Sequence, residues 1–183
     1  MKRSLLLVIL VAVLYLMGTT IAGEEVFKYV GVQKCKMCHK TAKSGDQYDK
    51  WQQSKHAKAY ETLATAEAKA VAKKIGLAGD PQQAKECLVC HTTAFDAPVD
   101  QKMETLTLTE GVSCEACHGP GSGYKSMKVM KAIYAGTDKG EAYGLIAPTK
   151  EVCVTCHNTK SPTFKEFDFD KAIKIIAHPV PAK

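Results

Sequence analysis

The chain has 183 residues and a mass of 19.9 kDa, enough for one domain of ordinary size or two very small ones. Its formal charge is only +6 and apolar residues make up 45%, which excludes intrinsic disorder. A single long apolar stretch excludes a polytopic membrane protein. Arg3 is the only arginine, so the rest of the chain lacks the planar guanidinium that reads phosphates and guanine edges, and we expect no nucleic-acid partner.

The first segment has the pattern of a secretory signal. Lys2 and Arg3 precede an apolar run over residues 5–17, and small residues follow up to Gly23. This pattern predicts a signal peptide over residues 1–22, cleaved after Ala22. The alternative is an uncleaved anchor, although the apolar stretch is at the short limit of a membrane span. We therefore expect an exported, periplasmic chain without a membrane span, residues 23–183 forming one domain, with the outer surface or the extracellular medium as alternatives.

All eight cysteines fall in four copies of the pattern C-x-x-C-H. The copies are Cys35, Cys38 and His39; Cys87, Cys90 and His91; Cys114, Cys117 and His118; and Cys153, Cys156 and His157. On a helical turn, positions i, i+3 and i+4 share one face. Two thiols can then form thioethers with one porphyrin while the histidine reaches its iron as the proximal ligand. The sequence thus predicts four covalently attached haem c groups.

Other uses of cysteine pairs fit this pattern poorly. A tetrahedral zinc site of four thiolates has no use for a histidine after every pair. Thioredoxin-like motifs need a strand–helix context and would not occur four times in one small chain. Four local disulfides would stabilise little, because such short loops remove little entropy from the unfolded chain.

The elements expected around these motifs are mostly helical. Residues 44–75, closed by Gly76, read as a helical stretch that carries His56. The sequence Asp80-Pro81-Gln82-Gln83 resembles a cap for a helix with the second motif. Residues 103–110 contain the alternation Thr105-Leu106-Thr107-Leu108-Thr109, which is the one strand signal in the chain.

The second half of the chain continues this arrangement. The sequence Gly119-Pro120-Gly121 ends the third motif, and a helix follows over residues 123–135 until Gly136. Thr149 caps the helix of the fourth motif, and Asp168 or Asp170 begins a last helix that ends at His178. We expect a mostly α, irregular domain wrapped around four haems, with at most a short β-hairpin.

Four haems present eight axial positions, and the motif histidines fill four of them. His56 and His178 are the only other histidines, and both are candidate distal ligands. Their alternatives are a half-buried surface histidine and a cation at a helix C-terminus. Met127 and Met130, on the helix after the third motif, could ligate a further iron or could simply fill gaps in the packing. At least one haem is therefore expected to be five-coordinate or weakly ligated.

The chain resembles the cytochrome c-554/c-prime family of tetrahaem cytochromes over about residues 29–179. The resemblance is carried by three segments: residues 34–39 with the first motif, Trp51 with the run Ser54-Lys55-His56-Ala57-Lys58-Ala59, and residues 111–121 around the third motif. It implies a mainly helical fold with haems in stacked and angled pairs. It also implies that His56 and His178 are distal ligands and that the haem of His91 lacks one.

The chain departs from the family pattern after the third motif, where the family has a further distal histidine. The matching stretch here is Lys125-Ser126-Met127-Lys128-Val129-Met130. Either a methionine replaces the histidine and raises the potential of that haem, which we favour, or a second iron is open.

These features predict an electron-transfer protein that works between other redox proteins. No acid–base or nucleophilic motif is present, so we do not expect an enzyme. One alternative is a haem enzyme that reduces a small nitrogen oxide or peroxide at an open iron. Another is a subunit of a conductive extracellular assembly, since oligomerisation remains open.

Overall fold

The computed structural model describes residues 26–181, so the predicted signal peptide lies outside the described residues. The described part consists of short helices joined by turns, and it contains an isolated bridge between Tyr29 and Lys102 but no strand. The helices are α2 (Val32–His39), α3 (Gln47–Gln52), α4 (Ala59–Thr62), α5 (Ala66–Lys74), α6 (Lys85–His91), α7 (Cys114–His118), α8 (Met127–Ala135), α9 (Lys150–Val154) and α10 (Phe169–Ile176), and the 3₁₀ turns are η1 (Ala42–Ser44), η2 (Val99–Gln101), η3 (Leu108–Glu110) and η4 (Gly140–Tyr143). Within residues 26–181, no helix is long and apolar enough to cross a membrane.

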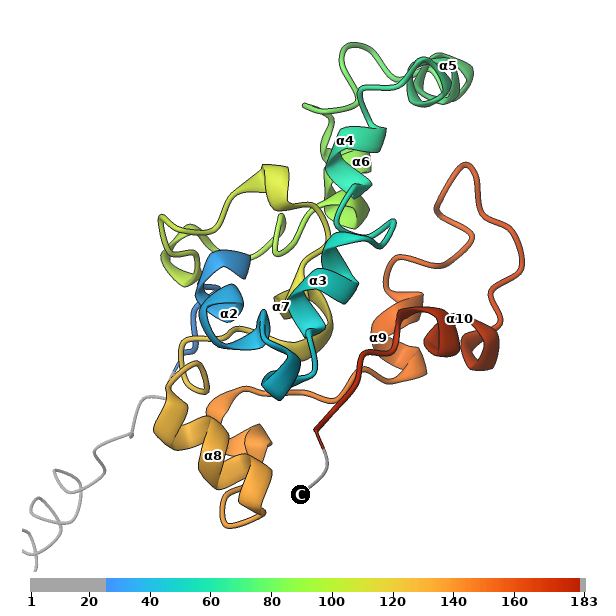
Figure 1. Ribbon diagram of the computed structural model, residues 1–183. Coiled ribbons are helices and arrows are strands. Elements are labelled where there is room, and N and C mark those ends of the chain that lie inside the picture. Colours follow the sequence, from blue (N-terminus) through green and yellow to red (C-terminus); the bar gives the residue numbers. More distant parts are fainter. Residues whose placement is uncertain (1–25, 182–183) are drawn as a thin grey trace, which may run out of the picture.

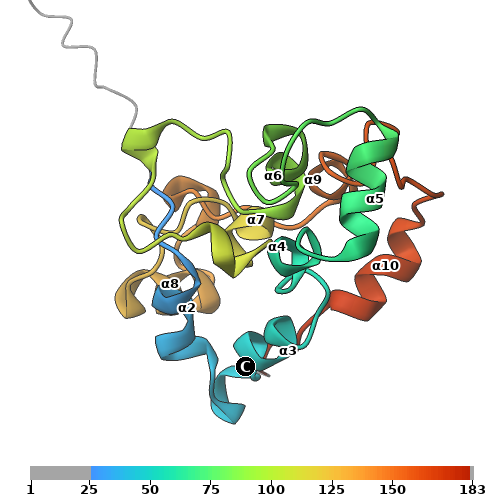
Figure 2. The same ribbon diagram turned by 90° about the horizontal axis from the view of Figure 1, so that it is seen from above.

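The mostly α fold class is confirmed, with α7 at the centre of the molecule in both views (Figures 1 and 2). The first three C-x-x-C-H motifs each lie within one short helix, respectively α2, α6 and α7. The fourth motif begins in α9 at Cys153, and its histidine lies in the bend after that helix. Helix α5 stands away from this centre in Figure 1.

The centre is held by the carboxylate of Glu115, which lies between the two cysteines of the third motif. This side chain is 2% exposed. Its oxygens accept hydrogen bonds from the backbone N–H groups of Val30 at 2.8 Å, Gly31 at 2.8 Å and Gly121 at 2.6 Å. Burial raises the pKa of Glu115, and the backbone donors partly oppose this rise. One carboxylate therefore joins the segment before α2, helix α7 and the loop after α7.

A second buried carboxylate extends this network. Glu110 accepts from the backbone N–H of Val32 at 3.1 Å and from the hydroxyl of Ser113 at 2.8 Å. Ser113 in turn shares a hydrogen bond of 2.9 Å with Thr93, just after α6. Three motif helices, α2, α6 and α7, are thus connected through buried polar groups whose hydrogen bonds are satisfied.

The expectation of one helical stretch over residues 44–75 is wrong. Gly45 and Asp46 have left-handed backbone angles, φ 96° and φ 50°, which end η1 before α3 begins. His56 lies in a turn, where its carbonyl accepts the N–H of Val112 at 3.0 Å. The hydroxyl of Thr65 then caps a new helix, α5. Tertiary contacts at the turn override the helix propensity of this stretch.

The alternation over residues 103–110 does not form a strand either. Residues 104–105 form a turn and η3 follows. The hydroxyl of Thr105 donates to the carbonyl of Val30 at 2.7 Å, and a Cβ at Gly31 would lie only 2.3 Å from the Thr105 carbonyl oxygen. The segment therefore packs against residues 30–31 through a side chain and a close backbone approach, which leaves no ladder of backbone hydrogen bonds.

Other expected boundaries are closer to the structure. The hydroxyl of Ser126 caps α8, and Gly136 ends it in a left-handed conformation with φ 78°. The carboxylate of Asp168 caps α10 by accepting from the N–H of Lys171 at 3.1 Å. Helix α6 begins at residue 85, later than the expected cap at Asp80, because residues 81–83 form a turn.

Glu115→Ala tests the central role of this carboxylate. We expect the free energy of unfolding to fall by about 3 kcal/mol or more, because three buried N–H groups lose their acceptor at about 1–3 kcal/mol each. Glu115→Gln retains one acceptor oxygen, so its free energy of unfolding should lie between those of the wild type and Glu115→Ala. Urea unfolding of the haem-loaded protein, followed by circular dichroism, measures both. Glu141→Ala, on exposed η4, is the control, and equal midpoints for it and Glu115→Ala would contradict this role.

Candidate functional site

The cysteines of different motifs lie side by side in two places. The side chain of Cys35 lies close to that of Cys114, and the side chain of Cys90 lies close to that of Cys156. Burial and the neighbouring thiol of Cys153 raise the pKa of Cys117 to about 11. The third motif thus adjoins the first and the fourth, and the second adjoins the fourth.

The motif histidines are oriented by hydrogen bonds at Nδ1. This atom lies 2.7 Å from the carbonyl oxygen of Ala59 in His91, 3.3 Å from that of Ile146 in His118, and 3.2 Å from the side-chain oxygen of Gln47 in His39. With the proton on Nδ1, the other ring nitrogen, Nε2, keeps its lone pair for a metal. His157 is oriented differently, by a ring stacked on Phe167 with centroids 4.7 Å apart.

Four of the six histidines form two pairs across the molecule. The ring centroids of His56 and His157 are 6.0 Å apart, and those of His118 and His178 are 5.9 Å apart. A metal–nitrogen bond to imidazole is about 2 Å long, so two imidazoles on opposite sides of one iron have centroids about 6 Å apart. Burial lowers the pKa of His56 and of His118, which favours the neutral imidazole that binds metal.

The histidine pairs and their surroundings fit haem. Among residues 26–181, no group of three or more His, Cys, Asp or Glu is arranged to hold a metal ion. The buried Nδ1 of His178 has no hydrogen-bond partner in the described structure. Phe169, Ile173 and Ile176 form an apolar stripe on α10, a helix without a buried residue. Such a half-buried apolar stripe suits the face of a porphyrin.

The remaining axial candidates are not brought together in this way. Within the described chain, neither His39 nor His91 has a ring contact with another histidine. Met127, in the first turn of α8, is 62% exposed, while Met130 is half-buried on the same helix. The proposed role of these methionines stays a prediction.

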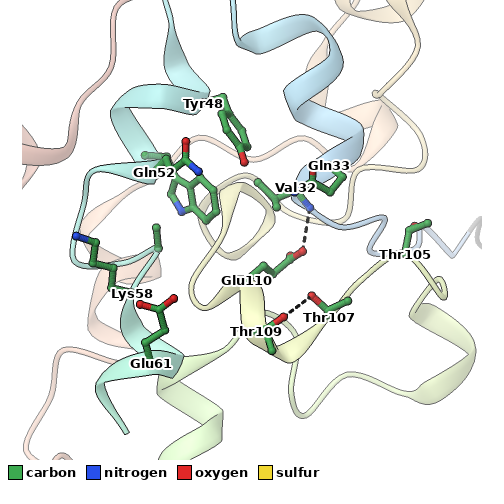
Figure 3. Close-up of a pocket in the computed structure, with 12 residues that line it drawn as sticks. Val32, Gln33, Tyr48, Gln52, Lys58, Glu61, Thr105, Thr107, Thr109 and Glu110 are labelled. Atoms are coloured by element: carbon green, nitrogen blue, oxygen red, sulfur yellow. Dashed lines mark hydrogen bonds between the residues drawn. The ribbon is translucent and has the colours of Figure 1, made fainter. Parts of the chain in front are cut away.

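Two cavities lie near the motifs. The smaller, about 270 Å³, is lined by Cys90, Cys156 and Ala116 together with other residues, so it adjoins the second, third and fourth motifs. The larger, about 400 Å³, is lined by α3 and η3 residues and contains no motif cysteine or histidine. Figure 3 shows its wall, where Glu110 is hydrogen bonded to Val32 and Thr107 to Thr109. None of the axial candidates therefore lines the larger cavity.

Several residues of this site could not be found from the sequence. Gln47 and the carbonyls of Ala59 and Ile146 orient motif histidines, and Phe167 stacks on His157. The partners in these contacts are 8 to 32 residues apart in the sequence, and no local motif predicts them. The sequence gives a weak indication of the role of Glu115, since this residue is a carboxylate inside a haem-attachment motif.

Comparison with known proteins agrees with this geometry. Residues 34–119, which include the first three motifs, match the family model "Cytochrome c554 and c-prime". Over these residues the chain is similar to this family. The curated cytochrome c-554 of Nitrosomonas europaea is 36% identical over 112 residues, which is 59% of this chain and 44% of that protein. The chain thus aligns with less than half of its curated relative.

A solved structure of reduced cytochrome c554 from the same organism aligns over a larger part. The alignment covers 82% of this chain and 83% of the chain in that structure, with a TM-score of 0.59 and 28% sequence identity. Cytochromes of the c554 family carry covalently attached haem c, typically four groups, and the four C-x-x-C-H motifs match that number. The expected cofactor, haem c, and the expected resemblance are therefore confirmed.

Proposed function

We propose that this chain is an exported, periplasmic electron-transfer protein that carries four haem c groups and passes electrons between other redox proteins. The proposal covers residues 23–183 as one tetrahaem domain, with residues 1–22 as the signal peptide. The observation that carries it is the pairing of His56 with His157 and of His118 with His178 at about the spacing of two ligands on one iron. When bound, each haem supplies an iron that gains and loses one electron.

The eight motif cysteines would attach the haems, and the four motif histidines would be the proximal ligands. In this proposal His56 is the distal ligand at the His157 site, and His178 is the distal ligand at the His118 site. Two imidazoles at one iron exclude a substrate from it, so these two sites are suited to electron transfer alone.

The order of transfer follows from which cysteines adjoin each other. Cys35 lies beside Cys114, Cys117 is near Cys153, and Cys156 lies beside Cys90. Haems attached through neighbouring cysteines are close together, so the proposed route runs from the first motif through the third and fourth to the second. The two ends of this route, at His39 and His91, are the sites where partners would exchange electrons.

A second candidate function is the reduction of a small nitrogen oxide or peroxide. Neither His39 nor His91 has a ring contact with a distal histidine in the described chain, and this favours at least one open iron. Met127 or Met130 would close one of the two sites and leave that of His91 open.

Removal of each distal histidine tests the ligand assignment. We expect His56→Gly and His178→Gly each to convert one low-spin haem of the oxidised protein to a high-spin one, because each iron loses a nitrogen ligand. Electron paramagnetic resonance and magnetic circular dichroism count the haems of each type. Lys58→Ala, an exposed neighbour of His56, is the control. An unchanged count in either histidine variant would contradict the assignment of that ligand.

Carbon monoxide and nitric oxide separate the two candidate functions. We expect the reduced protein to bind either gas at the His91 site. If Met127 or Met130 is a ligand at the His39 site, replacing that methionine by alanine should open this second site to the gas. Catalytic turnover of nitrite, hydroxylamine, nitric oxide or peroxide with a supplied reductant would support the enzyme. Gas binding at all four irons would contradict the proposed distal histidines.

A further inference from the structure

Gln47, the first residue of α3, contacts segments from two different haem sites. Its side-chain oxygen lies 3.2 Å from Nδ1 of His39, at the end of α2. Its side-chain nitrogen donates to the carbonyl oxygen of Pro179 at 3.0 Å, and also to that of Ser44. Pro179 directly follows His178, so one amide joins a candidate proximal ligand of one iron to the segment that carries the candidate distal ligand of another.

The orientation of this amide is determined by its partners. An amide has one oxygen that accepts and one NH₂ group that donates two hydrogen bonds. The carbonyls of Ser44 and Pro179 can only accept, so the NH₂ group must face them. The oxygen is then left for the N–H of His39, and the opposite orientation would place oxygen against two carbonyls.

The turn before α3 is shaped to let Pro179 approach. Gly45 has φ 96°, and a Cβ at this position would lie 2.6 Å from the carbonyl oxygen of Pro179. The hydroxyl of Thr41 accepts from the backbone N–H of Ser44 and holds the same turn. Only glycine fits both the left-handed backbone and the close contact.

The segment after α10 depends on such side-chain contacts. Pro179 and Pro181 have no backbone N–H, so their backbone can form hydrogen bonds only through the carbonyl oxygens. Gln47 donates to the first, and the hydroxyl of Tyr134 on α8 donates to the second at 2.9 Å. These two hydrogen bonds fix the chain immediately after His178, whose ring lies 5.9 Å from that of His118.

We propose that Gln47 is a positioning residue for two haems at once, an inference that rests on the proposed ligand roles of His39 and His178. Its oxygen orients the imidazole of His39 and sets how strongly that ring donates to its iron. Its NH₂ group holds the residue 179 carbonyl and keeps His178 at the iron of His118. Groups that accept from a ligating histidine raise its basicity, and their removal typically weakens metal binding by about 10–100-fold.

Two substitutions at Gln47 separate these roles. Gln47→Glu keeps an acceptor for His39 but makes it an anion, so we expect the potential of the His39 haem to fall. Gln47→Ala removes the acceptor, so the same potential should rise. Both variants lose the bond to Pro179, so both should weaken retention of His178 by about tenfold. Potentiometric titration followed by spectroscopy resolves the potential, and carbon monoxide binding to the reduced protein reports the iron released by His178.

Two further variants complete the test. Tyr134→Phe loosens the same segment without touching His39, so it should increase gas binding at the His118 site and leave the potential of the His39 haem unchanged. Gln53→Glu places the same new charge on the exposed end of α3 and should change neither quantity. A purely structural role for Gln47 would move the His39 potential in the same direction in Gln47→Glu and Gln47→Ala, and that result would overturn the proposal.

The outcome also separates this inference from the proposed function. If His178→Gly leaves the low-spin count unchanged, then His178 is not a ligand and the proposed function is wrong at that site. If His178→Gly opens one iron but the Gln47 variants change neither potential nor gas binding, the ligand assignment stands and the role of Gln47 is overturned.

Discussion

The carboxylate of Glu115 is the constraint on which the arrangement of motifs depends. It is buried between the two cysteines of the third motif. It accepts hydrogen bonds from three backbone N–H groups, two in the segment before α2 and one in the loop after α7. Through these bonds, Cys35 comes to lie beside Cys114. A carboxylate is suited to this task because it accepts several hydrogen bonds from otherwise unpaired backbone donors, whereas an apolar side chain would leave them unsatisfied.

The proposed axial ligands are also oriented by uncharged groups. Backbone carbonyls orient His91 and His118, an amide orients His39, and an aromatic ring orients His157. Each device fixes an imidazole without adding a charge near the iron. Differences between these partners, rather than differences between the motifs, would therefore set the four haem potentials apart.

The sequence predicted the chemistry of this protein better than its local structure. Four C-x-x-C-H motifs identified haem c, and the caps at Ser126 and Asp168 fall near the observed ends of α8 and α10. The predictions of a long helix over residues 44–75 and of a strand near Thr105 were wrong. In both places distant segments approach closely, Gly111 with His56 and Gly31 with Thr105. The only sign of such an approach in the sequence is a glycine, and many turns contain a glycine as well. The roles of Gln47 and Phe167 were unpredictable for the same reason, since both depend on partners brought near by the fold.

The described helices are all short, and α5 and α8, at nine residues each, are the longest of them. Isolated helices of fewer than about 12–15 residues are only marginally stable in water. The polypeptide by itself therefore has little local order with which to guide its own assembly. Before haem is attached, we therefore expect the four C-x-x-C-H segments to be accessible, and the fold to form together with haem binding.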